Sequence, residues 1–519
     1  MSKKFFKPIK VGGATALIAI TSLFSYAIGL FRDRIIATNF GTSSITDAYN
    51  ASFLIPDMLF NLFIAGALSA AFLPVFSEYL TKDKEEARKL ANTMLTTATI
   101  LITVLATIAF IFMPSIISSL FPETTNIAQS DIINMTRLML GSAILFAISN
   151  TLGNILMSYK HFLAYALSPI FYNLGIILGV IFLQEEYGIY SAAIGVVVGA
   201  SLHCIIRIID TASTGYRFRP QLDIKHPGFK KILKLMLPKS ISLIAWQVNL
   251  YIFAVIGMRM IEGSFSAFQF ARNIQSFAVS IFGIAFATAV FPSLATAFAK
   301  KEKKAYTAHI QKTIQRILFF TIPAAVGIMI LSPELVSLIL EGQAFDEKSV
   351  ELTSLLLFFF ALSIPFESLV HILARAFYAA QNTFTPMLIN LTAMAIIALT
   401  TIYATPIYGI KMFTIGFSIA FIIQVTLLLT FLKPNLQEFN TRALISSLAK
   451  TIVASGIMAI VVLVTKEFLS ANRLSYVIEI CAGGASFFLI AFLLKSPEIS
   501  SVSYILKRIT KKSGKNTQS

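Results

Sequence analysis

Long apolar segments separated by short polar breaks run along almost the whole 519-residue chain. A transmembrane helix needs about 20 consecutive apolar residues, and runs of this kind recur roughly fourteen times. Their cores begin near residues 15, 47, 90, 131, 163, 189, 235, 265, 317, 351, 385, 409, 446 and 475. This pattern predicts an all-α polytopic membrane protein with about fourteen transmembrane helices.

The breaks alternate in charge. Those after even-numbered spans are rich in Lys and Arg, as in TKDKEEARK and RFRPQLDIKHPGFKK, and so are both termini. Those after odd-numbered spans, such as GTSSITD and FPETTNIAQSD, are nearly free of Lys and Arg. Because cytoplasmic loops carry the excess of positive charge, an even number of spans with both termini in the cytoplasm fits each of these breaks. The basic N-terminus lacks a small-residue cleavage site and is interpreted as the start of a retained first span.

The chain also contains an internal repeat. An offset of about 218 residues aligns ALSAAFLPVFSEYLTKDKEEA with AFATAVFPSLATAFAKKEKKA, so that Pro74 falls on Pro292. At nearly the same offset SPIFYNL matches TPMLINL, which aligns Asn173 with Asn390. Six spans separate the copies, so this is a parallel repeat of two six-helix lobes, an architecture found in secondary transporters. The predicted parts are an N-lobe at 1–225, a C-lobe at 226–436, two further helices at 437–496 and a basic cytoplasmic tail at 497–519.

Composition narrows the function classes. A hydrophobic fraction of 56% with 13% charged residues is typical of membrane proteins. The net charge of +17 lies in short blocks between apolar runs, so no nucleic acid partner is expected. Two cysteines and five scattered histidines show no metal-ligand spacing, and no phosphate-binding G-x-x-x-x-G-K-[ST] motif is present. The sequence therefore predicts a protein that is not an enzyme and has no metal or other cofactor.

Charged residues inside the spans are the candidate functional groups. Arg32 and Asp33 lie in the first span and Arg272 in the eighth, at a similar depth but on different lobes. Since a charge at the bilayer centre costs at least about 2.5 kcal/mol, such residues usually face a cavity or a protein interior. Two guanidinium groups facing one cavity would suit a phosphate or diphosphate, with Asp33 and Asp47 as counter-charges in the empty state. Alternatively, Arg32 reaches the outer headgroups.

Glu367 and His371 lie four residues apart in the tenth span. This spacing places them on one helix face, where they could relay a proton or form a buried pair without a further role. We therefore mark both as candidates for coupling or gating.

Several segments resemble the MurJ (MviN) family of bacterial flippases for the peptidoglycan precursor lipid II, members of the MOP exporter superfamily. They include the opening run IGLFRDRIIATNFGTSSITDAYNASFLIPDMLFNLFIAGALSAAFLPVFSEY, FARNIQSF followed by FPSLA, EGQAFDE, and LARAFYAAQNTFTP. The resemblance covers spans one to twelve. It implies two six-helix lobes around a central cavity and a two-helix addition that forms a groove for the lipid tail.

The resemblance also implies residue roles. Arg32 matches an R-D motif and Arg272 a span-eight arginine, both thought to hold the lipid diphosphate, while Asp47 matches a T-D-A motif. Some relatives have an acidic sodium site in the second lobe, where this chain offers Asn390 as a candidate for coupling or gating. Three charged residues of the family are replaced in this chain. One family arginine falls on Ser25 or Tyr26, a second falls on Phe60 or Asn61, and a family acid is replaced by Ala65.

The resulting hypothesis is a monomeric multi-pass flippase of the bacterial cytoplasmic (inner) membrane that serves cell-wall synthesis and cell shape. It would move undecaprenyl-diphosphate-linked lipid II from the cytoplasmic to the outer leaflet by alternating access. Its partners would be this lipid-linked sugar diphosphate and the phospholipid bilayer. The alternatives are a flippase for another polyprenyl-linked oligosaccharide and a cation-coupled multidrug exporter. The coupling ion, Na⁺ or H⁺, is left open.

Overall fold

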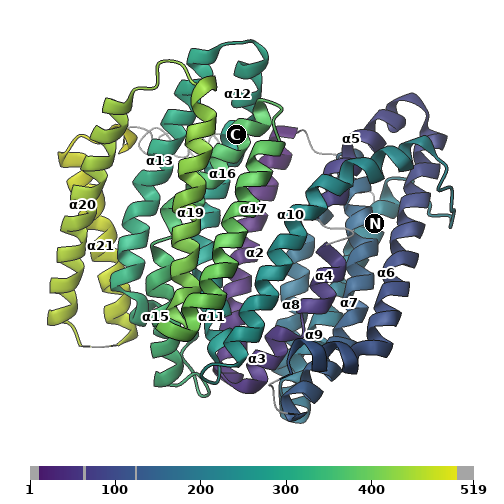
Figure 1. Cartoon of the computed structure of the whole chain (residues 1–519), viewed down its shortest axis with the longest axis horizontal. Helices are drawn as coiled ribbons and strands as arrows, with labels where there is room; N and C mark the ends of the chain where they lie inside the picture. The colour runs from purple at the N-terminus through teal and green to yellow at the C-terminus, as the bar shows by residue number, and fades with distance from the viewer. Residues whose placement is uncertain (1–10, 62–65, 123–125, 471, 500–519) are drawn as a thin grey trace, which may run out of the picture. The chain divides into compact units, whose positions relative to one another are not determined.

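The computed structural model describes residues 11–61, 66–122, 126–470 and 472–499, and the regular secondary structure within them is helical (Figure 1). The first half contains α2 (Val11–Phe40), α3 (Ser44–Ala51), α4 (Leu54–Phe60), α5 (Gly66–Lys82), α6 (Lys84–Leu120), α7 (Asn126–Ser158), α8 (Leu163–Tyr187), α9 (Tyr190–Ser213) and α10 (Pro227–Met258). The second half contains α11 (Ser264–Val279), η2 (Ser280–Ile284), α12 (Ala285–Ala299), α13 (Lys303–Ile330), α14 (Ser332–Leu340), α15 (Glu347–Ala361), α16 (Ile364–Ala379), α17 (Phe384–Leu399), η3 (Thr400–Ala404), α18 (Thr405–Tyr408), α19 (Lys411–Leu432), η4 (Lys433–Asn435), α20 (Thr441–Phe468) and α21 (Arg473–Leu493).

These helices confirm the predicted all-α membrane fold. Every predicted core begins inside a helix or within two residues of one. Within the described residues, ten helices are long and apolar enough to cross a membrane, or up to eleven if α15 and α16, which meet at a 47° bend, form one span. In α10 the stretch Leu243–Met258 is a shorter apolar helix. The count of fourteen spans stays a prediction.

The chain separates into two compact units. The first comprises Met1–Gln269 and Leu340–Ser349, and the second comprises Phe270–Ile339 and Val350–Ser519. The boundary between them falls inside α11, so α10 packs with the N-terminal helices. The predicted lobes, divided at residue 226, follow the internal repeat and not the packing of the helices. This division stays a prediction.

Both copies of the repeat carry a proline inside a helix that is followed by a long helix. Pro74 lies inside α5 and Pro292 inside α12. A proline inside a helix removes a backbone hydrogen bond, and neighbouring helices compensate for this loss in membrane proteins. A long helix follows in each case, α6 after α5 and α13 after α12.

A seam of glycines joins α8 to α9 in the first unit. Gly175 and Gly179 of α8 face Gly195 and Gly199 of α9. A Cβ added at Gly175 would lie 2.2 Å from the Gly199 Cα, and one at Gly199 would lie 2.3 Å from the Tyr172 carbonyl oxygen. Small residues four positions apart let transmembrane helices approach this closely. The seam therefore fixes the position of α8 and of the polar side chains that it carries.

Replacing Gly199 with Val is expected to destabilise the first unit by about 2 to 3 kcal/mol, because overpacking a tight contact costs this much. Thermal unfolding of the purified protein in detergent measures the effect. Gly141→Val is the matched control, since a Cβ at Gly141 meets nothing within 4 Å. Equal melting temperatures for the two variants would contradict the tight seam.

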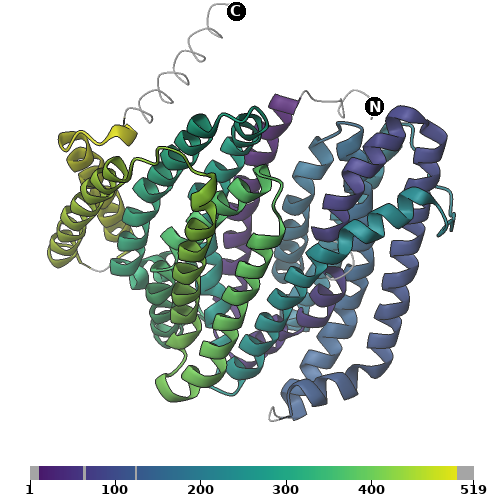
Figure 2. The same cartoon turned by 45° about the horizontal axis from the view of Figure 1, so that its top comes forward.

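The last two helices of the second unit pack against α13. Figures 1 and 2 show α20 and α21 side by side against α13. Phe319 of α13 contacts Phe487 of α21 with ring centroids 5.1 Å apart, and Met458 of α20 belongs to the same buried cluster. Because many exposed side chains of α20 and α21 are large and apolar, this pair presents a lipid-facing surface.

Candidate functional site

Arg32 is held by three hydrogen bonds in the first unit. Its Nε and Nη2 donate to the Asp33 Oδ1 at 3.1 and 2.6 Å, and its Nη1 donates to the Asn173 Oδ1 at 3.0 Å. The Arg32 side chain remains 23% exposed, whereas that of Asp33 is only 6% exposed. A charge-assisted pair of this kind fixes the guanidinium while part of its donor edge stays accessible.

Asn173 is itself oriented by the helix that carries it. Its Nδ2 donates to the Pro169 carbonyl at 3.1 Å, one turn earlier in α8. This bond orients the amide of Asn173. Its nitrogen donates to the backbone carbonyl, so its oxygen faces Arg32 and accepts the hydrogen bond from the guanidinium. The sequence marked Asn173 only as part of the repeat, and the structure adds its contact with Arg32.

Asp57 is an acidic group that the sequence analysis did not single out. It lies half-buried in α4, within electrostatic reach of Tyr172, and Tyr172 is in turn close enough to Arg32 to interact with it electrostatically. The signal that could have revealed it is a carboxylate inside the apolar stretch LIPDMLF.

Arg272 belongs to a polar group in the second unit. It lies half-buried on α11 and interacts electrostatically with Glu367 of α16. One turn further along α11, Gln275 donates through Nε2 to the Glu367 Oε2 at 2.7 Å and to the Ser363 Oγ at 3.2 Å. The structure therefore gives Glu367 a cationic neighbour and an amide donor. Gln275 was missed because a neutral amide beside Arg272 carries no distinct sequence signal.

His371 and Arg375 continue the polar face of α16. His371 lies one turn after Glu367 and within electrostatic reach of Arg375. The Arg375 Nη1 donates to the Ile284 carbonyl at 3.3 Å, at the end of the π-helix η2. Because a π-turn disturbs the regular backbone ladder, Arg375 has a structural role here.

Asp47 of α3 lies at the N-terminus of α11. Its Oδ1 accepts from the Ser266 backbone N–H at 2.7 Å and from the Ser266 Oγ at 2.5 Å, and its Oδ2 accepts from the Gly263 N–H at 3.1 Å. A carboxylate at this position satisfies backbone donors that lack a partner inside the helix. The predicted contact of Asp47 with substrate stays a prediction.

Asp47 is part of a wider set of contacts in the first unit, which we call the clasp. The clasp consists of Thr38, Gly41, Thr42, Ser44, Asp47, Glu262, Gly263, Ser266, Gly342, Ala344 and Ser349. The Ala344 N–H donates to the Thr38 carbonyl at 2.9 Å, and the Thr42 Oγ1 donates to the Ser349 Oγ at 2.7 Å. Gly41 has a positive φ of 62°, and a Cβ there would lie 2.2 Å from the Ala344 oxygen. The clasp thus joins the end of α2 to two later loops by close backbone contact.

Glu262 adds an ionisable group to the clasp. The Ser44 backbone N–H donates to its Oε1 at 2.9 Å, and this bond holds the pKa of Glu262 below its ordinary value. A lowered carboxylate pKa stabilises the clasp at neutral pH, and the contribution is lost as the pH falls through the lowered value.

Asn390 occupies a different place in the second unit. Its Oδ1 accepts from the Gln424 Nε2 at 3.4 Å, which links α17 to α19. Within the described residues, no group of three or more His, Cys, Asp or Glu side chains is arranged to hold a metal ion. The structure thus brings Arg32 together with Asp33, and Arg272 with Glu367, while Asp47 and Asn390 have other partners.

Comparisons with known proteins agree with this architecture. A sequence model of the family described as "Lipid II flippase MurJ" matches residues 36–481. A protein of Thermotoga maritima named "Probable lipid II flippase MurJ" is 27% identical over 94% of this chain and 98% of its own length. A Burkholderia cenocepacia protein named "Lipid II flippase MurJ" is 25% identical over 76% of this chain and 78% of its own.

Solved structures with a similar fold include a member of the same family. One described as "Lipid II flippase MurJ, inward closed conformation" is 27% identical, with a TM-score of 0.81 over 93% of this chain and 100% of that one. An inward-facing multidrug transporter of the MATE family in the MOP superfamily matches with a TM-score of 0.63, over 82% of this chain and 99% of its own, at 15% identity, which shows a shared fold. Since the family model covers most of the sequence, the chain belongs to the lipid II flippase MurJ family.

Proposed function

We propose that this multi-pass membrane protein moves lipid II, an undecaprenyl-diphosphate-linked precursor, from the cytoplasmic to the outer leaflet without changing it chemically. The observation that carries the proposal is the arginine in each half of the repeat. Arg32 is fixed by Asp33 and Asn173, and Arg272 lies beside Glu367. Guanidinium groups suit phosphate oxygens because their donors form a planar fork. The names of the relatives support the choice of substrate.

Alternating access would be governed by the clasp. In the orientation that the basic breaks favour, with both termini in the cytoplasm, the clasp lies at the outer end of α2. Its closure would keep the outer side shut while the diphosphate is taken up from the inner leaflet. Release of the substrate outside would then require the bonds of Asp47, Glu262 and Ala344 to break. A monomer suffices for this cycle.

Glu367, His371 and Asn390 are the candidates for coupling or gating. Glu367 and His371 share one face with Arg272 as neighbour, so protonation of either would alter the charge that Arg272 meets. This arrangement supports H⁺ as the coupling ion. Asn390 faces Gln424 and offers only neutral ligands to Na⁺.

A second candidate substrate follows from the replaced family arginines. Tyr26 is exposed and Phe60 and Asn61 are half-buried. Fewer cationic groups would meet the sugar and the peptide of the substrate, so another polyprenyl-linked oligosaccharide is the alternative cargo.

Depletion of the protein is expected to leave lipid II on the cytoplasmic leaflet. Leaflet-specific labelling of the lipid-linked precursors in depleted cells measures this, with a complemented strain as the control. Accumulation of a different polyprenyl-linked glycan would select the alternative cargo, and unchanged distribution of all such precursors would contradict the flippase function.

A further inference from the structure

A polar cavity of about 690 Å³ lies between α13, α20 and the end of α21 in the second unit. Its walls carry four cationic side chains, namely Lys312, Arg316, Lys450 and Lys495. Lys312 and Arg316 are one helical turn apart, and the Lys450 Nζ donates to the Lys495 carbonyl at 3.1 Å. Four cations that line one cavity repel each other, and a bound anion would relieve the repulsion.

One carboxylate also lines the cavity. Glu498 is only 5% exposed, and its Oε1 accepts from the Ser447 Oγ at 2.6 Å. Its Oε2 is buried and has no hydrogen-bond partner in the part of the chain that the structure describes. A buried carboxylate oxygen without a donor is costly. The cavity therefore offers cations for a phosphate and, beside them, an acceptor for a hydroxyl group.

Neighbouring surfaces point to a lipid as the source of this phosphate. Phe492 and Leu493, just before Lys495 at the end of α21, are 66% and 63% exposed, and Ile445 of α20 is 59% exposed. Acyl chains can lie on these apolar side chains while the headgroup enters the cavity. Residues 500–519 contain Lys and Arg but no Asp or Glu, so the side chains of this segment do not supply an anion for the cavity.

We propose that this cavity binds the headgroup of phosphatidylglycerol from the surrounding membrane. Its phosphate would meet Arg316 and Lys450, and a glycerol hydroxyl would donate to the Glu498 Oε2. The excess of cations in the lining favours an anionic lipid over a zwitterionic one, and the Glu498 acceptor favours a headgroup with a free hydroxyl. Binding of this lipid does not depend on the proposed transport function.

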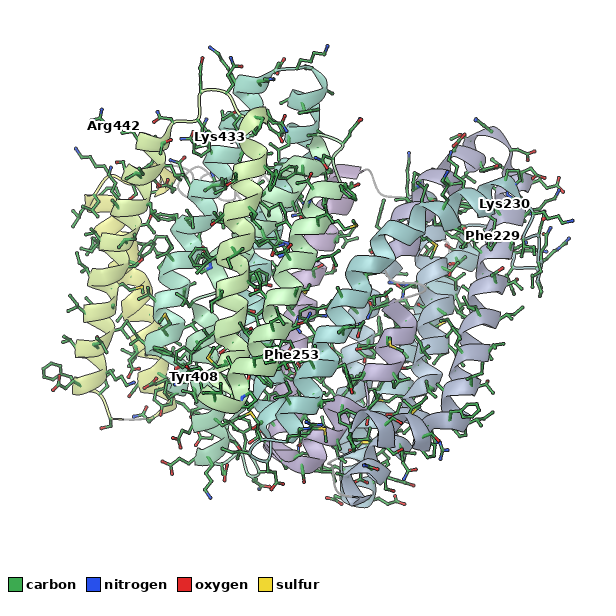
Figure 3. The ribbon with its side chains drawn as sticks, in the orientation of Figure 1. Phe229, Lys230, Phe253, Tyr408, Lys433 and Arg442 are labelled. Atoms are coloured by element: carbon green, nitrogen blue, oxygen red, sulfur yellow. The ribbon has the colours of Figure 1, made fainter. Side chains whose placement is uncertain are left out.

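The test is a titration of the full-length protein in detergent with phosphatidylglycerol, followed by native mass spectrometry. The triple variant Lys312→Gln, Arg316→Gln, Lys450→Gln is expected to bind about 100-fold more weakly, since each cation near a lipid headgroup contributes roughly a factor of five. The matched control is Lys433→Gln with Arg442→Gln. These exposed cations lie at the same end of the unit as the start of α20, opposite to Tyr408 (Figure 3), and do not line the cavity.

Two further measurements keep the proposal falsifiable. Glu498→Gln retains an oxygen for Ser447 and is expected to reduce the preference for phosphatidylglycerol over phosphatidic acid, which lacks the hydroxyl, by about fivefold. If the triple variant fails to fold, Lys312→Gln alone, at an exposed position, is expected to weaken binding about fivefold. Unchanged binding in a folded variant would overturn the proposal. Displacement of the lipid by millimolar inorganic phosphate would overturn it too, by assigning the cavity to a soluble anion.

Discussion

Replacing Arg272 or Arg32 with Ala is expected to reduce lipid II translocation at least about 100-fold while the protein remains folded and inserted. Each substitution removes the charge-assisted hydrogen bonds that would hold the diphosphate, and such bonds contribute roughly 1.5 to 3 kcal/mol each. The measurement is the translocation rate of labelled lipid II, together with rescue of depleted cells. The Lys substitutions are expected to give intermediate rates, since they keep the charge and lose the planar fork.

Arg137→Ala is the control for this result. Arg137 also lies within a membrane helix, but its Nε donates to the Phe110 carbonyl at 3.1 Å and its guanidinium lies over the Phe110 ring. Its loss is expected to leave translocation within about twofold of normal, because exposed contacts of this kind contribute little. Full activity in Arg272→Ala would assign Arg272 a structural role beside Glu367.

A disulfide across the clasp is expected to stop transport completely and reversibly. The Thr42 and Ser349 side-chain oxygens are 2.7 Å apart, so the double variant Thr42→Cys, Ser349→Cys places two thiols in contact. Oxidation would hold the clasp shut, and reduction should restore the rate. Cys481 is exposed and is changed to Ser in the background used for this experiment.

Each single cysteine variant, oxidised in the same way, is the control and should remain active. Normal translocation by the fully cross-linked protein would show that the clasp stays closed throughout the cycle. In that case the substrate would leave by another route, and the proposed role of the clasp would be wrong.

The helices could be predicted from the sequence because each has a long apolar run bounded by polar residues. The repeat could also be found in the sequence, since Pro74 and Pro292 each lie inside a helix that a long helix follows. The placement of Arg32 beside Asp33 followed from their adjacency in the chain. The π-helix η2 could not be predicted, because its sequence SIFGI has the composition of an ordinary apolar helix. Its existence depends on packing, since a Cβ at Gly283 would lie 2.7 Å from the Ser368 Cα of α16.

The role of Asp47 shows the limit of motif reasoning. The motif marked the residue, and its acidity suggested a counter-charge for arginine. In the structure its carboxylate accepts hydrogen bonds from the backbone N–H groups of Gly263 and Ser266, which lie more than 200 residues later in the chain, and its predicted contact with substrate stays a prediction. Backbone donors are present at every helix start, so only the tertiary fold decides which one a given carboxylate reaches. The contact of Asn173 with Arg32 also depends on the tertiary fold, because the glycine seam positions α8, which carries Asn173.

The ion pair of Arg32 with Asp33 has a consequence for turnover. An arginine without a counter-charge would bind the diphosphate tightly and release it slowly, because leaving would strand a charge in a poorly solvated place. In the proposed transport cycle, Asp33 would compete for the same guanidinium and pair with it again as the cargo departs. Binding would then be an exchange of one anion for another, with a smaller free-energy difference between the loaded and the empty protein. The Asp33 carboxylate would thus limit the affinity for the cargo and shorten its residence time, as repeated delivery requires.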